Sequence, residues 1–144
     1  MEMIEVPIIQ RTFIRADRVS VFRSIATAKG LDEWFTRGSK VDEKAGGEIL
    51  FVWRDWGADK VNHTAGGPIL EYRPPERFVY KWGSDPPSTV EIDLIEKDGG
   101  TLVTAREVGF ANDRTGWDRC LDCATGWGEA LTFLKFYLED GALY

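Results

Sequence analysis

The chain has 144 residues, 43% hydrophobic and 29% charged, a composition typical of one globular domain that buries roughly two-thirds of its unfolded surface. Its 18 Lys and Arg against 24 Asp and Glu give a net charge of -6, so there is no basic excess for phosphate contacts and nucleic acid is not an expected partner. No apolar run approaches the roughly 20 residues of a transmembrane helix, and the acidic N-terminus is unlike a signal peptide, so no membrane span is expected.

The first predicted element is a strand over residues 8–15, where β-branched and aromatic residues alternate with polar ones. Asp17 follows as a plausible N-cap of a short helix in which Val19, Phe22 and Ile25 recur at helical spacing. Gly30 is expected to interrupt this helix before a second short helix over residues 31–35.

The middle of the chain predicts an antiparallel meander, because short segments of apolar alternation are separated by pairs of glycines and prolines. The expected strands cover residues 48–54, 63–73, 77–83, 88–97 and 101–110. Their connections are too short for crossover helices. With the first strand, the predicted sheet has six strands.

A long C-terminal helix is predicted after the polar run 111–114. Its apolar positions follow steps of three and four: Trp117, Leu121, Ala124, Gly128, Leu131, Leu134 and Leu138. Gly126 and Gly128 each cost about 1 kcal/mol relative to Ala inside a helix, so a bend or a close approach to the sheet is expected there. The fold class is therefore α+β, with a curved six-stranded antiparallel sheet wrapped on this helix.

A cavity between sheet and helix is the first candidate site. A curved sheet holding a single helix tends to leave a space, and the predicted strands are rich in rings that could border it or simply fill the core. The candidate ligand-binding residues are Trp34, Phe51, Trp53, Tyr80, Trp82, Ile92, Glu107, Trp117 and Leu121. In the last strand, alternation alone allows either Leu102, Thr104 and Arg106 or Val103, Ala105 and Glu107 to face inward.

The segment GPILEYRPPERFVYKW, residues 67–82, resembles the sheet signature of the activator of heat-shock-protein-90 ATPase homologue group of the START-like, helix-grip (SRPBCC) superfamily. Further agreements run along about the whole chain: Ile14, Ala16, Val21, Phe22, Leu31, Trp34, Phe35, Gly46, Gly47, Gly100, Thr101, Gly109, Phe110, Gly116 and Trp117. Two positions depart from the family pattern. Asp17 stands where the family commonly has Pro, and Glu107 where it often has His.

The resemblance implies a helix-grip fold and places Val103, Ala105 and Glu107 on the inner face. Glu107 would then point into an aromatic cavity, where it could donate or accept a hydrogen bond to a ligand. The alternatives for Glu107 are a pair with an Arg or exposure at the strand end. The superfamily includes lipid carriers, polyketide cyclases and co-chaperones of the stress response, so the fold alone does not select a function.

The chain lacks the residue sets of several common sites. His63 is the single histidine, so neither a histidine-based metal site nor a Ser-His-Asp triad is expected, and we interpret His63 as a surface or edge residue. Cys120 and Cys123 form a C-x-x-C sequence inside a helix, where free packed thiols are favoured over a redox or metal pair. We expect no metal, no nucleotide and no other cofactor, and a cytoplasmic protein with a single domain over residues 1–144.

Three functions remain open. The first is a non-enzymatic domain that binds a small hydrophobic or amphipathic molecule between sheet and helix. The second, implied by the resemblance, is an interaction module that binds a chaperone or another partner through its exposed sheet face or acidic surface. The third is a cyclase, dehydratase or hydrolase that uses Glu107 as acid or base, assisted by Tyr80, Asp118 or Arg106.

Overall fold

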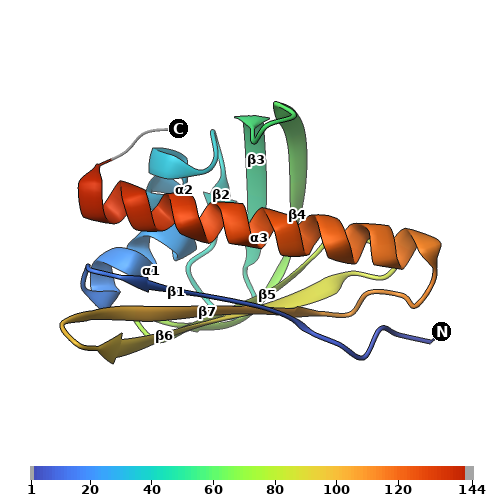
Figure 1. Ribbon diagram of the computed structural model, residues 1–144, viewed down its shortest axis with the longest axis horizontal. Helices are drawn as coiled ribbons and strands as arrows, with labels where there is room; N and C mark the ends of the chain where they lie inside the picture. The colour runs from blue at the N-terminus through green and yellow to red at the C-terminus, as the bar shows by residue number, and fades with distance from the viewer. Residues whose placement is uncertain (1, 142–144) are drawn as a thin grey trace.

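The computed structural model describes residues 2–141, and its chain forms one antiparallel sheet with a long helix laid across it (Figure 1). The elements in chain order are β1 (Ile8–Ile14), α1 (Arg18–Ala26), α2 (Ala28–Trp34), β2 (Lys40–Val41), β3 (Glu48–Trp56), β4 (Val61–Arg73), β5 (Arg77–Trp82), β6 (Ser88–Lys97), β7 (Gly100–Val108) and α3 (Arg114–Asp140). This is the predicted α+β helix-grip architecture.

The sheet has the strand order β1-β7-β6-β5-β4-β3-β2, so the first long strand pairs with the last. Ile8 lies opposite Glu107 and Ile14 opposite Thr101 in that pairing. The predicted count of six strands was wrong by one, because the described residues form seven. The additional strand, β2, pairs only Lys40 and Val41 with β3, and two residues are too short to produce a recognisable alternation.

Both N-terminal helices begin at side-chain caps. Asp17 accepts a hydrogen bond from the backbone nitrogen of Ser20 at 2.9 Å, as predicted for this position. Gly30 does not end a helix but lies inside α2, which begins earlier because Thr27 caps it. A Cβ atom at Gly30 would lie 1.8 Å from the carbonyl oxygen of Arg23, so only glycine allows α1 and α2 to approach this closely.

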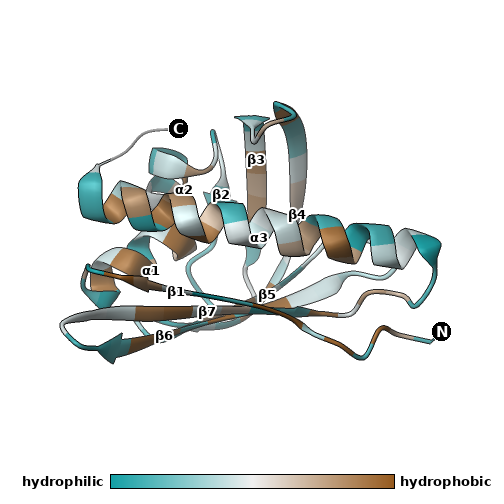
Figure 2. Cartoon of the chain, viewed as in Figure 1, coloured by the Kyte–Doolittle hydropathy of each residue, from teal (hydrophilic) through white to brown (hydrophobic). Residues whose placement is uncertain are grey.

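The long helix α3 begins at Asp113, whose side chain accepts a hydrogen bond from the backbone nitrogen of Gly116, and ends at Gly141 with a φ of 69°. It crosses the sheet over β1 (Figure 1), where the side chain of Gln10 donates to the carbonyl oxygen of Ala124 at 3.3 Å. Figure 2 shows hydrophobic and hydrophilic residues interspersed along its length, as expected of a helix with one buried side. Among residues 2–141, no helix is long and apolar enough to span a membrane.

The buried face of α3 differs from the predicted one in its first half. Trp117 and Leu121 are 40% and 59% exposed, whereas Cys120 is buried and Cys123 and Trp127 are partly buried. At about 100° per residue, the stripe that begins at Trp117 lies roughly a quarter turn away from the stripe through Cys120 and Trp127. Both stripes share Leu131 and Leu134, which are buried, and the sequence pattern alone did not separate them.

The inner face of β7 carries Val103, Ala105 and Glu107, all at most 1% exposed. The register implied by the family resemblance is therefore confirmed. The alternatives of a strand-end exposure or an Arg partner for Glu107 are wrong, because Glu107 is 1% exposed and forms no ion pair among the described residues.

Candidate functional site: a ring-lined pocket beside the long helix

A pocket of about 790 Å³ lies between the β3–β4 hairpin, the end of β5 and the middle of α3. The hairpin rises past α3 (Figure 1), so one wall of the pocket is made of strand residues and the opposite wall of helix residues. The lining residues are Phe35, Trp53, Trp56, Val61, His63, Thr64, Ala65, Gly66, Trp82, Gly83, Ser84, Arg119, Asp122, Cys123, Gly126, Trp127 and Ala130. Val61, His63, Ser84 and Asp122 are exposed and mark its mouth.

The strand wall is a continuous set of packed rings. The indole of Trp53 stacks on Phe51 with ring centres 5.2 Å apart and contacts Phe35 edge to face at 5.6 Å. His63 stacks on the Trp53 indole at 6.0 Å. Such contacts hold the rings in defined positions, so this wall presents a preformed aromatic surface.

Glu107 lies beneath the pocket and joins its two walls. One carboxylate oxygen accepts hydrogen bonds from the indole nitrogen of Trp82 at 2.7 Å and from the hydroxyl of Ser88 at 2.5 Å. The other oxygen accepts from the indole nitrogen of Trp127 at 2.8 Å. Three donors satisfy this buried carboxylate, which is the condition for placing such a group in a protein interior.

Arg119 extends this network to the pocket surface. Its guanidinium donates to the Oγ of Ser88 at 3.3 Å and to the carbonyl oxygen of Pro86 at 3.0 Å. Ser88 therefore receives a hydrogen bond from Arg119 and donates one to Glu107. The guanidinium also lies 5.1 Å from the ring centre of Phe110.

One polar atom of the strand wall lacks a partner. The indole nitrogen of Trp53, a residue 7% exposed, is the one buried side-chain nitrogen or oxygen within residues 2–141 that makes no hydrogen bond. A buried donor without an acceptor is costly and uncommon in folded proteins.

The helix wall has a gap in its side chains at Gly126. A Cβ atom built at Gly126 meets no atom within 4 Å, so this glycine borders open space. Gly128 is different, because its nearest neighbour is the side chain of Gln10 at 3.8 Å. That is an ordinary van der Waals distance, so the expected close approach to the sheet is found at neither glycine, and Gly126 contributes to the pocket.

Two ionisable groups near the pocket are shifted by burial. Burial, followed by the negative charge of Glu107, raises the pKa of the Cys123 thiol to about 12. The same two causes raise the pKa of the Tyr80 hydroxyl well above its ordinary value. Cys120 and Cys123 are both free thiols, as predicted.

The structure places the predicted ligand-binding residues in three groups. Trp53 and Trp82 line the pocket, and Glu107 lies directly behind it. The second group is packed in the core: Trp34, Phe51, Tyr80 and Ile92. Trp117 and Leu121 lie on the exposed side of α3, outside the pocket.

The residues predicted to assist Glu107 in catalysis do not converge on it, except for the buried Tyr80. Arg106 pairs with Glu91 on the opposite face of the sheet. Asp118 pairs with Arg114 on the exposed side of α3. Within the described part of the chain, no group of three or more His, Cys, Asp or Glu residues is placed to hold a metal ion.

The sequence reasoning missed Phe35, Trp56, Arg119, Gly126 and Trp127 as pocket residues. A signal for Trp127 exists, because it lies seven residues after Cys120 and seven before Leu134, on one helical face. No comparable signal exists for Trp56, which reaches the pocket only because β3 extends past the predicted end at residue 54.

A long helix gripped by a curved antiparallel sheet, with a ring-lined pocket between them, defines a START-like helix-grip domain. Residues 15–139 match the family model described as "Activator of Hsp90 ATPase homolog 1-like protein". The chain belongs to this family. No curated protein sequence matches the chain.

Solved structures agree with the fold at low sequence identity. Protein SSP2350 from Staphylococcus saprophyticus is 22% identical, with a TM-score of 0.77 and 96% of each chain covered. The Aha1 dimer from Colwellia psychrerythraea is 19% identical, with a TM-score of 0.78, covering 94% of this chain and 98% of that one. CalU16 from Micromonospora echinospora is 23% identical, with a TM-score of 0.73, covering 97% and 84% respectively.

Proposed function

We propose that this domain binds a small hydrophobic or amphipathic molecule in the pocket between the β3–β4 hairpin and α3, without catalysing a reaction. The observation that carries the proposal is the pocket itself, about 790 Å³ in volume and bordered by the indoles of Trp53, Trp82 and Trp127. Pockets that hold small molecules commonly fall between about 300 and 1,000 Å³ and are lined by apolar and aromatic side chains with a few polar groups.

Gly126 supports a binding role for this space. Glycine inside a helix costs about 1 kcal/mol relative to alanine. Neither a turn nor a close contact requires glycine at this position, since α3 is continuous and a Cβ atom there would meet nothing within 4 Å. The effect of the missing side chain is to keep the pocket open.

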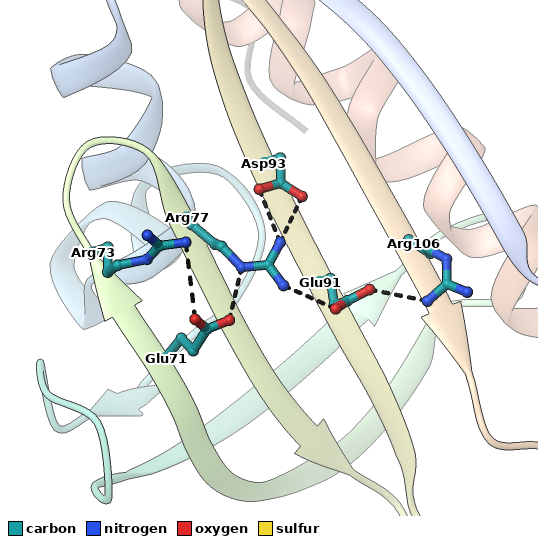
Figure 3. Close-up of polar contacts among 6 residues, drawn as sticks. All are labelled: Glu71, Arg73, Arg77, Glu91, Asp93 and Arg106. Carbon is teal, nitrogen blue, oxygen red and sulfur yellow. Dashed lines mark hydrogen bonds and ion pairs between the residues drawn. The ribbon is translucent and has the colours of Figure 1, made fainter.

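The outer face of the sheet gives less support to an interaction module. Figure 3 shows its charged residues pairing with one another, and Arg77 alone contacts Glu71, Glu91 and Asp93 at 2.7 to 2.8 Å. Arg106 and Arg73 complete the network at its two ends. Its three arginines and three carboxylates balance, so these charges are already satisfied within the domain.

The test uses the neutral fluorescent probe N-phenyl-1-naphthylamine with the unchanged protein and two variants. Gly126→Leu places a side chain in the pocket and should weaken probe binding at least about tenfold. Thr125→Leu adds a similar side chain at an exposed position of the same helix turn and should leave binding unchanged. Absence of probe binding, or equal binding by Gly126→Leu, would overturn the proposal.

A second candidate function follows from the family model, whose description names an activator of the Hsp90 ATPase. We propose it as the alternative in which the domain contacts a chaperone in the cytoplasm. Its test is the ATPase rate of purified Hsp90 with and without this protein. An unchanged rate, together with no detectable complex, would remove it.

A further inference from the structure

We infer that the ligand of this pocket is a flat aromatic molecule carrying an anionic group, which Arg119 holds. This inference rests on the proposed function, because it names the chemical class of molecule that the same pocket would bind. It follows from the positive charge and the free hydrogen-bond donors in the pocket wall.

The Arg119 guanidinium is incompletely used within the domain. It makes two hydrogen bonds, to the carbonyl oxygen of Pro86 and the Oγ of Ser88, although a guanidinium has five N–H donors. Among residues 2–141, no carboxylate forms an ion pair with it, whereas Arg73, Arg77 and Arg106 of the outer sheet face each contact at least one. Arg119 therefore presents donors and a positive charge to the pocket that it lines.

Neither Glu107 nor Asp122 neutralises Arg119 by direct contact. Glu107 reaches it only through the Ser88 hydroxyl, and its two oxygens already accept three hydrogen bonds. Asp122 follows one turn later on α3 and is exposed at the pocket mouth, where water screens its charge. A carboxylate or sulfonate from a ligand would meet the guanidinium with the planar two-oxygen geometry that arginine favours.

The rest of the wall favours a flat ring. The indoles of Trp53, Trp82 and Trp127 offer ring surface from both walls. Indole faces also attract cations, but the charge of Arg119 opposes a cationic ligand in the same pocket.

The test compares two probes that share one ring system. 8-Anilinonaphthalene-1-sulfonate carries a sulfonate, and N-phenyl-1-naphthylamine is the same molecule without it. Both become fluorescent in an apolar site, so their dissociation constants are measured by the same titration. The sulfonate should bind the unchanged protein at least about tenfold more tightly than the neutral probe, as a charge-assisted hydrogen bond predicts.

Two variants and a salt series test whether Arg119 causes the preference for the sulfonate. Arg119→Gln should remove the preference for the sulfonate, so that the ratio of the two dissociation constants falls to about one, while Arg119→Lys should retain part of the preference. In the unchanged protein, raising NaCl from about 0.05 to about 0.5 M should weaken the sulfonate and not the neutral probe, because screening acts only on the charged ligand. The salt series remains informative if Arg119→Gln does not fold.

The outcomes separate the two claims. If neither probe binds, the proposed function and this inference both fail. If the neutral probe binds, is lost in Gly126→Leu, and binds as tightly as the sulfonate, the pocket stands and the anionic ligand is overturned. A preference for the sulfonate that survives Arg119→Gln, or one that salt does not reduce, also overturns the role of Arg119.

Discussion

The Glu107 carboxylate accepts a hydrogen bond from the indole nitrogen of Trp127 at 2.8 Å, and this contact joins β7 to α3. The same carboxylate accepts from Trp82 of β5 at 2.7 Å. Because Trp82 and Trp127 border the pocket from its two walls, Glu107 sets how far apart those walls stand at the inner end. Glu107 therefore positions the two walls of the pocket relative to each other.

Replacing Glu107 with leucine should lower the free energy of unfolding by about 2–4 kcal/mol, because the buried Ser88 hydroxyl and two partly buried indole donors lose their acceptor. Glu107→Gln should cost less, since its amide keeps one acceptor oxygen. Urea unfolding measures both, and Glu129→Leu on the exposed side of α3 is the control. A loss in Glu107→Leu no larger than in the control would contradict this role.

Gly126 and Gly116 should respond in opposite directions to alanine. Gly126→Ala should raise the free energy of unfolding by about 0.5–1 kcal/mol, since the new methyl group meets nothing within 4 Å and alanine favours the helix. Gly116→Ala should lower it, because its Cβ atom would lie 1.8 Å from the carbonyl oxygen of Ala111. Thermal and urea unfolding measure both changes in the free energy of unfolding. Equal changes in the two variants would contradict the packing described around these glycines.

Stability should fall as the pH decreases from about 4.5 to about 2. Hydrogen bonds from Arg23 and then Tyr137 lower the pKa of Glu33 to about 2, and those from Lys135 and the Arg15 backbone lower that of Glu139 to about 2. A carboxyl group with a lowered folded-state pKa stabilises the fold fully above its unfolded value of about 4.5 and loses that contribution as the pH falls to about 2.

The matched variant for this pH dependence is Glu139→Gln. It should be less stable than the unchanged protein at pH 7 and should show a shallower decline in urea midpoint below about pH 4.5. The two proteins should converge below about pH 2, where both versions of the side chain are uncharged. Parallel curves over the whole range would contradict a lowered pKa for Glu139.

Cys123 should react slowly with iodoacetamide in the folded protein. Burial, with the charge of Glu107 nearby, raises the pKa of its thiol to about 12 and keeps the reactive thiolate scarce at pH 8. In a Cys120→Ser variant, alkylation of Cys123 should be at least about a hundredfold slower in the folded than in the urea-unfolded state. Similar rates in the two states would show that the thiol is accessible and ordinary.

Arg77 should matter more than Arg106 in the charged network of the outer sheet face. Its side chain is 20% exposed and contacts three carboxylates, whereas Arg106 is 44% exposed and contacts one. Arg77→Met should cost about 2 kcal/mol and Arg106→Met less than about 1 kcal/mol in urea unfolding. Equal costs would indicate that the network contributes little beyond an exposed pair.

The strands were predictable because each carries an apolar alternation and each connection carries glycine or proline. The predicted segment 88–97 coincides with β6, and the inner register of β7 followed once the family resemblance chose between its two faces. An apolar alternation identifies the buried face of a strand from neighbouring residues alone, so it predicts any strand that is long enough to show it. It failed for β2, which has two residues.

The pocket was harder to predict because it depends on three-dimensional placement. The aromatic content of the strands predicted Trp53 and Trp82 as pocket residues, and both line the pocket. Phe51 and Tyr80 are aromatic too, yet they are packed in the core. Only the crossing of α3 over the sheet separates the two groups. The apolar stripe through Trp117 and Leu121 gave a wrong prediction of the buried face of α3. Two overlapping stripes of apolar residues fit the same helical period, and only the three-dimensional placement distinguishes them.

The pairing of β1 with β7 joins segments about ninety residues apart in sequence, from Ile8 opposite Glu107 to Ile14 opposite Thr101. During synthesis β1 leaves the ribosome well before β7, the strand with which it pairs. The apolar side chains of β1 therefore have no partner strand while the residues between β1 and β7 are translated. Loop closure over such a span makes this the slow step expected in folding, and helix α3, which docks on β1, completes the assembly after it.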